Sequence, residues 1–224
     1  MRLEAVVFDL DGTLVETAPD LHAVLAELLE REGLRAPPLS AVRTMIGDGA
    51  KQLIRRAFAW QNLALEEDRL ENLYAWFLER YTEEPARWSA PYPGVPETLA
   101  ELAARGLRLG VCTNKPQRPS ERLLAALGLA EKFAAILGGD ARPYRKPDPR
   151  HLAATLEVLS VSPRAAVMVG DSANDVAVAR ALGIPCVLVS FGYTAVPARE
   201  LGADRVVDRF DELPDALRAL SGSP

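Results

Sequence analysis

The sequence has little of several features that mark other classes of protein. Its 224 residues include two cysteines, Cys112 and Cys186, each within an apolar stretch. Two cysteines outside any Cys-x-x-Cys pattern exclude a disulfide framework and a cysteine-rich metal site, and they are typical of a reducing compartment. No apolar run approaches the roughly 18 residues needed to span a bilayer. We therefore expect neither a disulfide-stabilised secreted protein nor a membrane protein.

Basic residues are too few for broad binding of nucleic acid. The 26 lysines and arginines are outnumbered by 31 acidic residues, so the formal net charge is −5, whereas chains that bind nucleic acid are usually basic. Glu4 and Asp9 interrupt the apolar stretch that a signal peptide would need. We expect a cytoplasmic monomer or homodimer that binds a small molecule, with neither nucleic acid nor a membrane as a partner.

Lysine is scarce among the basic residues. The four lysines are Lys51, Lys115, Lys132 and Lys146, against 22 arginines. Where arginine is the rule, a lysine can mark a place that needs a compact, movable point charge, although codon bias explains most isolated lysines equally well.

Short apolar runs alternate with helical stretches through most of the chain. The predicted strands are residues 4–8, 107–112, 133–137, 165–169 and 185–189, with a short sixth at 205–207. Continuous apolar strands separated by helices indicate a parallel sheet that is covered on both faces. The predicted fold class is therefore α/β, a doubly wound parallel sheet of the Rossmann-like kind.

The segment 15–84 breaks this alternation. It contains no convincing strand, and leucine-rich stripes at helical spacing run through residues 21–29, 53–58 and 70–78. We predict a small α-helical cap at 15–84, inserted into an α/β catalytic core that comprises residues 1–14 and 85–224.

Two acidic motifs directly follow predicted strands. Asp9 and Asp11 come at the end of the first strand, and Asp171 and Asp175 follow the strand at 165–169. Like charges at short range stay ionised only beside a cation, and carboxylate oxygens suit Mg²⁺. Asp171 could reach the same ion as Asp9, with Asp175 supporting it from one helical turn further on. Taken alone, either motif could equally be a solvated turn or a helix cap.

Candidate phosphate ligands follow other strands. Thr113 and Asn114 offer a hydroxyl and backbone N–H groups at a strand-to-helix turn, and Lys146 offers an ammonium beside a proline-rich turn. Because ligands of doubly wound sheets bind beyond the carboxyl ends of the strands, we expect these groups and the aspartates to converge there.

Taken in order, these motifs resemble those of the haloacid dehalogenase-like hydrolase superfamily. The matching segments are DLDGT (9–13), Thr113-Asn114, Lys146-Pro147 and GDSAND (170–175), and the likeness covers essentially the whole chain, the inserted cap included. Within the superfamily, LVETAPDL (14–21), IGDGA (46–50) and TNKP (113–116) are most similar to bacterial phosphoglycolate phosphatases.

The resemblance implies a Mg²⁺-dependent phosphatase that hydrolyses a small phosphate monoester, 2-phosphoglycolate, to glycolate and phosphate. Asp9 would be the nucleophile that forms an aspartyl-phosphate, and Asp11 would be the general acid and base. The ion would be held by the carboxylates of Asp9 and Asp171 and by the backbone carbonyl of Asp11, with Asp175 behind them. The phosphoryl oxygens would be held by Thr113, the backbone of Asn114 and Lys146.

Substrate choice is expected to come from the cap. Gly47 and Gly49 precede a predicted helix whose free N–H groups could receive the carboxylate of the substrate, with Arg43, Lys51 and Lys115 adding positive charge; a plain hinge turn is the alternative. Other functions consistent with the motifs are a sugar-phosphate or nucleotide phosphatase, a phosphomutase of the β-phosphoglucomutase type, and a non-catalytic phosphate-binding regulatory module.

Overall fold

The computed structural model describes residues 2–222, and the core of this part is a parallel six-stranded sheet with the strand order β5-β4-β1-β6-β7-β8. The strands are β1 (Ala5–Phe8), β4 (Arg108–Cys112), β5 (Ala135–Leu137), β6 (Ala166–Gly170), β7 (Cys186–Val189) and β8 (Arg205–Val207). The predicted strands are thus present, each with ends within two residues of the prediction, and the doubly wound α/β fold is confirmed.

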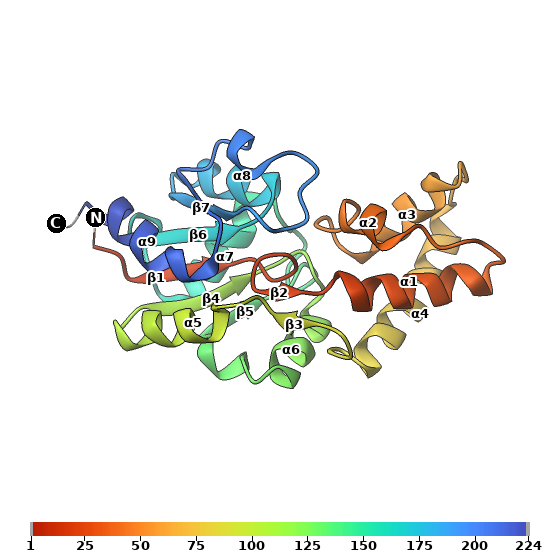
Figure 1. Ribbon diagram of the computed structural model, residues 1–224, viewed down its shortest axis with the longest axis horizontal. Helices are drawn as coiled ribbons and strands as arrows, with labels where there is room; N and C mark the ends of the chain where they lie inside the picture. Colours follow the sequence, from red (N-terminus) through yellow and green to blue (C-terminus); the bar gives the residue numbers. More distant parts are fainter. Residues whose placement is uncertain (1, 223–224) are drawn as a thin grey trace.

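Alternation of side chains along the strands builds one apolar cluster on each face of the sheet. In β1, Val6 and Phe8 belong to one cluster, whereas Ala5 and Val7 belong to the other. The first cluster includes side chains of α5 (Val95–Ala104), α6 (Gln117–Ala126) and α9 (Leu213–Ser221), and the second those of α7 (Pro149–Leu159) and α8 (Ala173–Ala181). Helices therefore cover both faces of the sheet (Figure 1). Short 3₁₀ helices occur at Ala130–Lys132, Pro163–Ala165, Ala198–Glu200 and Phe210–Glu212.

A helical unit lies beyond one end of the sheet (Figure 1). It consists of α1 (Ala18–Arg31), α2 (Leu39–Arg43), α3 (Ala50–Trp60) and α4 (Glu67–Glu83), which enclose an apolar cluster of their own around Leu25, Ile54 and Phe77. We propose that this unit is the predicted cap, residues 15–84, and that residues 1–14 and 85–224 form the core, of which residues 1 and 223–224 lie outside the described part.

The chain enters and leaves the helical unit through a pair of short strands. β2 (Val15–Glu16) runs antiparallel to β3 (Ala90–Pro91), and the Tyr92 amide donates to the Leu14 carbonyl. The expectation of no strand in 15–84 is therefore wrong for its first two residues. These short strands form because the two connecting segments lie side by side, and the local sequence of each segment does not predict a strand.

No helix within residues 2–222 is both long and apolar enough to cross a membrane.

His151, on α7, is a buried polar residue that packs without a hydrogen bond. Its side chain has no solvent exposure, and neither ring nitrogen has a partner among the described residues. Burial and the positive charge of Lys146 lower the pKa of His151 to about 4. The ring is therefore neutral in the folded protein at neutral pH.

This burial predicts an acid-dependent loss of stability. The unfolded chain protonates the residue near pH 6.5 and the folded chain only near pH 4, so from pH 7 to pH 5 it should lower the free energy of unfolding by about 2 kcal/mol. Urea unfolding of wild type and His151→Leu at both pH values measures this share, because other groups titrate alike in the two proteins. An equal pH dependence in the two proteins would contradict the prediction.

Candidate active site

Three neighbouring strands bring the first site residues together. β1 lies between β4 and β6, with Phe8 in register with Val111 and Val169. The residues that follow these strand ends therefore meet at one edge of the sheet, which places Asp9, Thr113 and Asp171 close together although they are far apart in the sequence. This is the convergence that the positions of the motifs predict.

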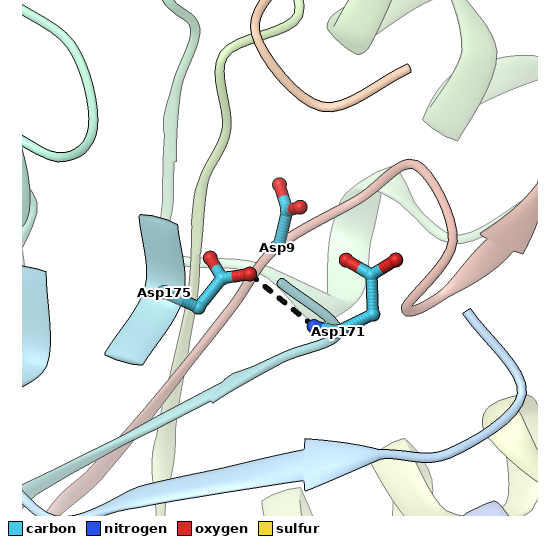
Figure 2. A group of neighbouring side chains, drawn as sticks. All are labelled: Asp9, Asp171 and Asp175. Atoms are coloured by element: carbon cyan, nitrogen blue, oxygen red, sulfur yellow. Dashed lines mark hydrogen bonds between the residues drawn. The ribbon is translucent and has the colours of Figure 1, made fainter. Parts of the chain in front are cut away.

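Asp9, Asp171 and Asp175 form a compact carboxylate group. One carboxylate oxygen from each residue lies within 4.8 Å of the others, and all three side chains are buried. Figure 2 shows the three carboxyl groups close together, those of Asp9 and Asp171 on the loops that follow β1 and β6 and that of Asp175 on α8. Three acids in so small a volume repel one another, which makes the group a candidate cation site.

The pKa values reflect this crowding. Burial raises the pKa of Asp9 to about 6, because the attraction of Lys146 offsets only part of the burial and of the repulsion from Asp175. Burial, followed by repulsion from Asp9 and Asp175, raises the pKa of Asp171 well above its ordinary value. Both shifts disfavour the ionised forms, so a further positive charge would stabilise the group.

Lys146 is the cation that the chain itself supplies to the carboxylate group. Its Nζ lies 2.9 Å from Asp9 Oδ1 and 2.6 Å from Asp175 Oδ1, and its side chain is buried. Attraction to Asp175 and Asp9 outweighs desolvation and raises the pKa of Lys146. The lysine is thus charged and held beside the predicted nucleophile.

Asp175 organises the loop that carries Asp171. Its Oδ2 accepts hydrogen bonds from the amides of Asp171 (3.2 Å) and Ser172 (3.0 Å) and from the Ser172 hydroxyl (2.7 Å) at the start of α8. Gly170 permits this arrangement, because a Cβ there would lie 2.2 Å from Asp175 Cγ. Asp175 therefore caps its helix and supports the site at the same time.

Sequence reasoning missed the loop after β7, which holds the other side of Asp171. The Tyr193 amide donates to Asp171 Oδ2 at 2.7 Å, and a Cβ at Gly192 would lie 2.2 Å from Asp171 Cβ. The Tyr193 hydroxyl accepts from the amides of Thr17 and Ala18, where α1 begins. The only available signal was that the loop follows a strand end.

The Asp11 side chain is not part of the carboxylate group. It meets Lys115, whose Nζ lies 3.0 Å from Asp11 Oδ1 and 2.8 Å from the hydroxyl of Tyr81 on α4. Attraction to Asp11 and Tyr81 overcomes desolvation and raises the pKa of Lys115, and burial raises the pKa of Tyr81 to about 12. Sequence reasoning missed Tyr81, because its spacing on α4 is that of an ordinary packing residue.

Thr113 and Asn114 are both buried at the end of β4. The Thr113 hydroxyl accepts from the Lys115 amide at 3.2 Å. The Asn114 side chain donates to two carbonyls, those of Lys146 and Gly47, each at 3.0 Å. Asn114 thus connects the lysine loop of the core to the helical unit, a contact that the sequence did not suggest.

A small cavity of about 30 Å³ lies between the core and the helical unit. The core contributes Asp9, Asp11, Thr113, Asn114, Lys115, Pro116 and Pro119, and the helical unit contributes Leu21, Ile46, Gly47, Gly49, Ala50, Leu53, Leu78 and Tyr81. Of the residues predicted to set substrate choice, Gly47, Gly49 and Lys115 line this cavity. Arg43 instead pairs with Glu16 at 2.7 Å, and Lys51 pairs with Glu71.

Comparison with known proteins places this geometry in a family. The model of the haloacid dehalogenase-like hydrolases matches residues 3–183. A phosphoglycolate phosphatase of Rhodospirillum rubrum is 45% identical over 218 residues, which cover 96% of this chain and 90% of the relative. A phosphoglycolate phosphatase of Caulobacter vibrioides is 45% identical over 215 residues, 96% of this chain and 91% of the relative.

Solved structures agree with these relatives. A predicted phosphoglycolate phosphatase from Haemophilus somnus superposes with a TM-score of 0.89 at 32% identity, covering 97% of this chain and 99% of that one. CbbY from Rhodobacter sphaeroides, solved in complex with phosphate, superposes with a TM-score of 0.81 at 29% identity, covering 94% and 96%. The chain is therefore an enzyme similar to phosphoglycolate phosphatases, and it belongs to the haloacid dehalogenase-like hydrolase family.

Proposed function

We propose that the protein is a Mg²⁺-dependent phosphatase that hydrolyses 2-phosphoglycolate to glycolate and phosphate through an aspartyl-phosphate on Asp9. The observation that carries the proposal is the buried Asp9 carboxylate, 2.9 Å from Lys146 and within the same 4.8 Å group as Asp171. The full-length similarity to phosphoglycolate phosphatases supports the substrate. The two buried, unpaired cysteines fit a cytoplasmic setting.

The carboxylate group fits a divalent metal ion. Three buried acids face a single lysine, so the group has an excess of negative charge. Carboxylate oxygens are the ligands that Mg²⁺ prefers. Asp9 and Asp171 would hold the ion with the Asp11 backbone carbonyl. Bound there, Mg²⁺ would supply positive charge to neutralise the phosphoryl oxygens.

The residues of the chain divide the reaction between them. Asp9 attacks phosphorus, so that a bond from its carboxylate oxygen to phosphorus forms while the ester bond to the leaving oxygen breaks. Asp11 gives that oxygen its proton and then takes one from the water that cleaves the aspartyl-phosphate. Lys146, Thr113 and the Asn114 backbone hold the phosphoryl oxygens, whose charge would otherwise repel the carboxylate nucleophile.

The lining of the cavity bears on the substrate. Its cap side is apolar except for the Gly47–Gly49 turn and the Tyr81 hydroxyl. At about 30 Å³ the cavity is smaller than any phosphate ester, so the helical unit must stand further off to admit the substrate. The carboxylate of 2-phosphoglycolate could be received by the first amides of α3, beside Gly49, and by Lys115.

The proposed activity predicts a ranking of substrates. With Mg²⁺, kcat/KM should be highest for 2-phosphoglycolate in a panel that also contains glucose 6-phosphate, β-glucose 1-phosphate, AMP and p-nitrophenyl phosphate. Phosphate release measures turnover, and Asp9→Asn should lose at least about 10³-fold in kcat while keeping its circular dichroism spectrum. The matched control Asp208→Asn, at an exposed carboxylate, should keep wild-type kcat. A sugar phosphate or nucleotide at the top of the ranking would overturn the substrate, and turnover by Asp9→Asn would overturn the nucleophile.

The proposed ion predicts stabilisation by metal. Mg²⁺ at about one hundred times its Kd should add about 2.7 kcal/mol to the free energy of unfolding, which raises Tm by about 5–10 °C for a chain of this length. Asp171→Asn should lose this rise, and without metal it should melt no lower than wild type, because the substitution relieves buried repulsion. Scanning fluorimetry measures both effects. A Mg²⁺ shift of wild-type size in Asp171→Asn would contradict the assignment.

The Gly47–Gly49 turn predicts a sensitivity to added bulk. Gly49 has φ +87°, and a Cβ there would lie 3.2 Å from the Asn114 carbonyl. Gly49→Ala should therefore displace the turn and raise KM for 2-phosphoglycolate about tenfold. Gly33→Ala is the matched control, because Gly33 also has a positive φ (+70°) in the cap but has open space around it. Equal KM values for the two variants would contradict a role of the turn in binding.

A further inference from the structure

Two asparagines of the core hold the turn that precedes α3. Asn114 Nδ2 donates to the Gly47 carbonyl at 3.0 Å, and Asn174 Nδ2 donates to Asp48 Oδ1 at 2.7 Å. The asparagines follow different strands, β4 and β6, so the turn is held from two directions. These contacts join the helical unit to the loops that carry the site.

Asp48 is held by a contact within the helical unit as well as by its contact with the core. Its Oδ2 pairs with Arg56 on α3, and Arg56 also donates to the Met45 carbonyl at 2.8 Å. Burial alone would raise the pKa of Asp48, but hydrogen bonds from Asn174 and Arg56 hold it below its ordinary value. Asp48 therefore presents an ionised oxygen, which is a strong acceptor, to the core.

Asn174 lies next to the carboxylate group in the sequence and contacts the helical unit. It lies between Asp171 and Asp175 in the sequence, at the second residue of α8. Within residues 2–222 its side chain makes no hydrogen bond other than the one to Asp48. The side-chain amide of Asn174 is therefore not needed to hold the loop at the start of α8. Asp175 already holds that loop through the backbone amides of Asp171 and Ser172.

We propose that Asn174 is a positioning residue that clasps the Gly47–Gly49 turn through Asp48 and so holds the helical unit closed over a small substrate. The proposal rests on the proposed function for its kinetic consequence, but the clasp itself is a property of the fold. The side chain of Asn114 holds the same turn through the Gly47 carbonyl, and Asn114 is buried in the site. Asn174 and Asp48 are only partly buried, so their contact can open without disrupting the core.

The clasp acts on binding more than on chemistry. Without the clasp, part of the free energy of substrate binding is used to close the helical unit. The apparent Kd is then the intrinsic Kd divided by the fraction of molecules that are closed. A saturating substrate still closes the site around Asp9 and Asp11. KM should therefore rise while kcat changes little.

A double-mutant cycle tests the clasp. Asn174→Ala and Asp48→Ala should each raise KM for 2-phosphoglycolate about tenfold with kcat within about twofold of wild type, and the double variant should be no worse than the worse single variant. Asn72→Ala, at an exposed asparagine of α4, is the matched control and should leave KM unchanged. Additive effects in the double variant would overturn the proposal.

Two further measurements separate this proposal from the proposed function. Small-angle X-ray scattering needs no substrate, and Asn174→Ala should show a larger radius of gyration than wild type as the helical unit moves away from the core. Asn174→Ala should also keep the Mg²⁺-induced rise in Tm. Scattering identical to wild type, or loss of the Mg²⁺ effect, would overturn the clasp even if another ester proved to be the substrate.

Discussion

Lys146 lies 2.9 Å from Asp9 and 2.6 Å from Asp175, and all three groups are buried. Charges can be buried together in this way only when each is paired, because desolvation otherwise outweighs their attraction. The one lysine balances part of the charge of Asp9, Asp171 and Asp175, and the remaining repulsion makes the group a candidate cation site. The turns around the group follow from this need: backbone amides point at Asp175 and Asp171, and glycines leave room for them.

The helical unit depends on the same loops. The Tyr193 amide holds Asp171, and the Tyr193 hydroxyl holds the start of α1, so the entry to the helical unit is tied to the acidic group. A second connection runs from Tyr81 of α4 to Lys115 and through it to Asp11. In the proposed reaction, a cavity closed by such polar contacts would exclude water from the Asp9 carboxylate and keep Asp11 in place.

Much of this site could be predicted because it follows from the geometry of a parallel sheet. Asp9, Thr113 and Asp171 each follow a strand, and neighbouring parallel strands end at the same edge. The rarity of lysine was informative for Lys115 and Lys146, which are buried in the site, but not for Lys51, which pairs with Glu71 near the surface, or for Lys132, which is exposed. Arg43, expected at the substrate, pairs with Glu16 because α2 places it over that side chain.

The sequence by itself determined the order of the strands and helices, the acidic motifs and the lysine beside them, because these depend on periodicity and on residues that directly follow strands. Tertiary structure alone decided which distant side chains meet: Tyr81 with Lys115, Tyr193 with Asp171, Asn174 with Asp48. The last pair joins residues that are 126 positions apart in the sequence. No local pattern encodes these pairs: the first and last depend on how the helical unit packs against the sheet, and the second depends on how two loops of the core meet.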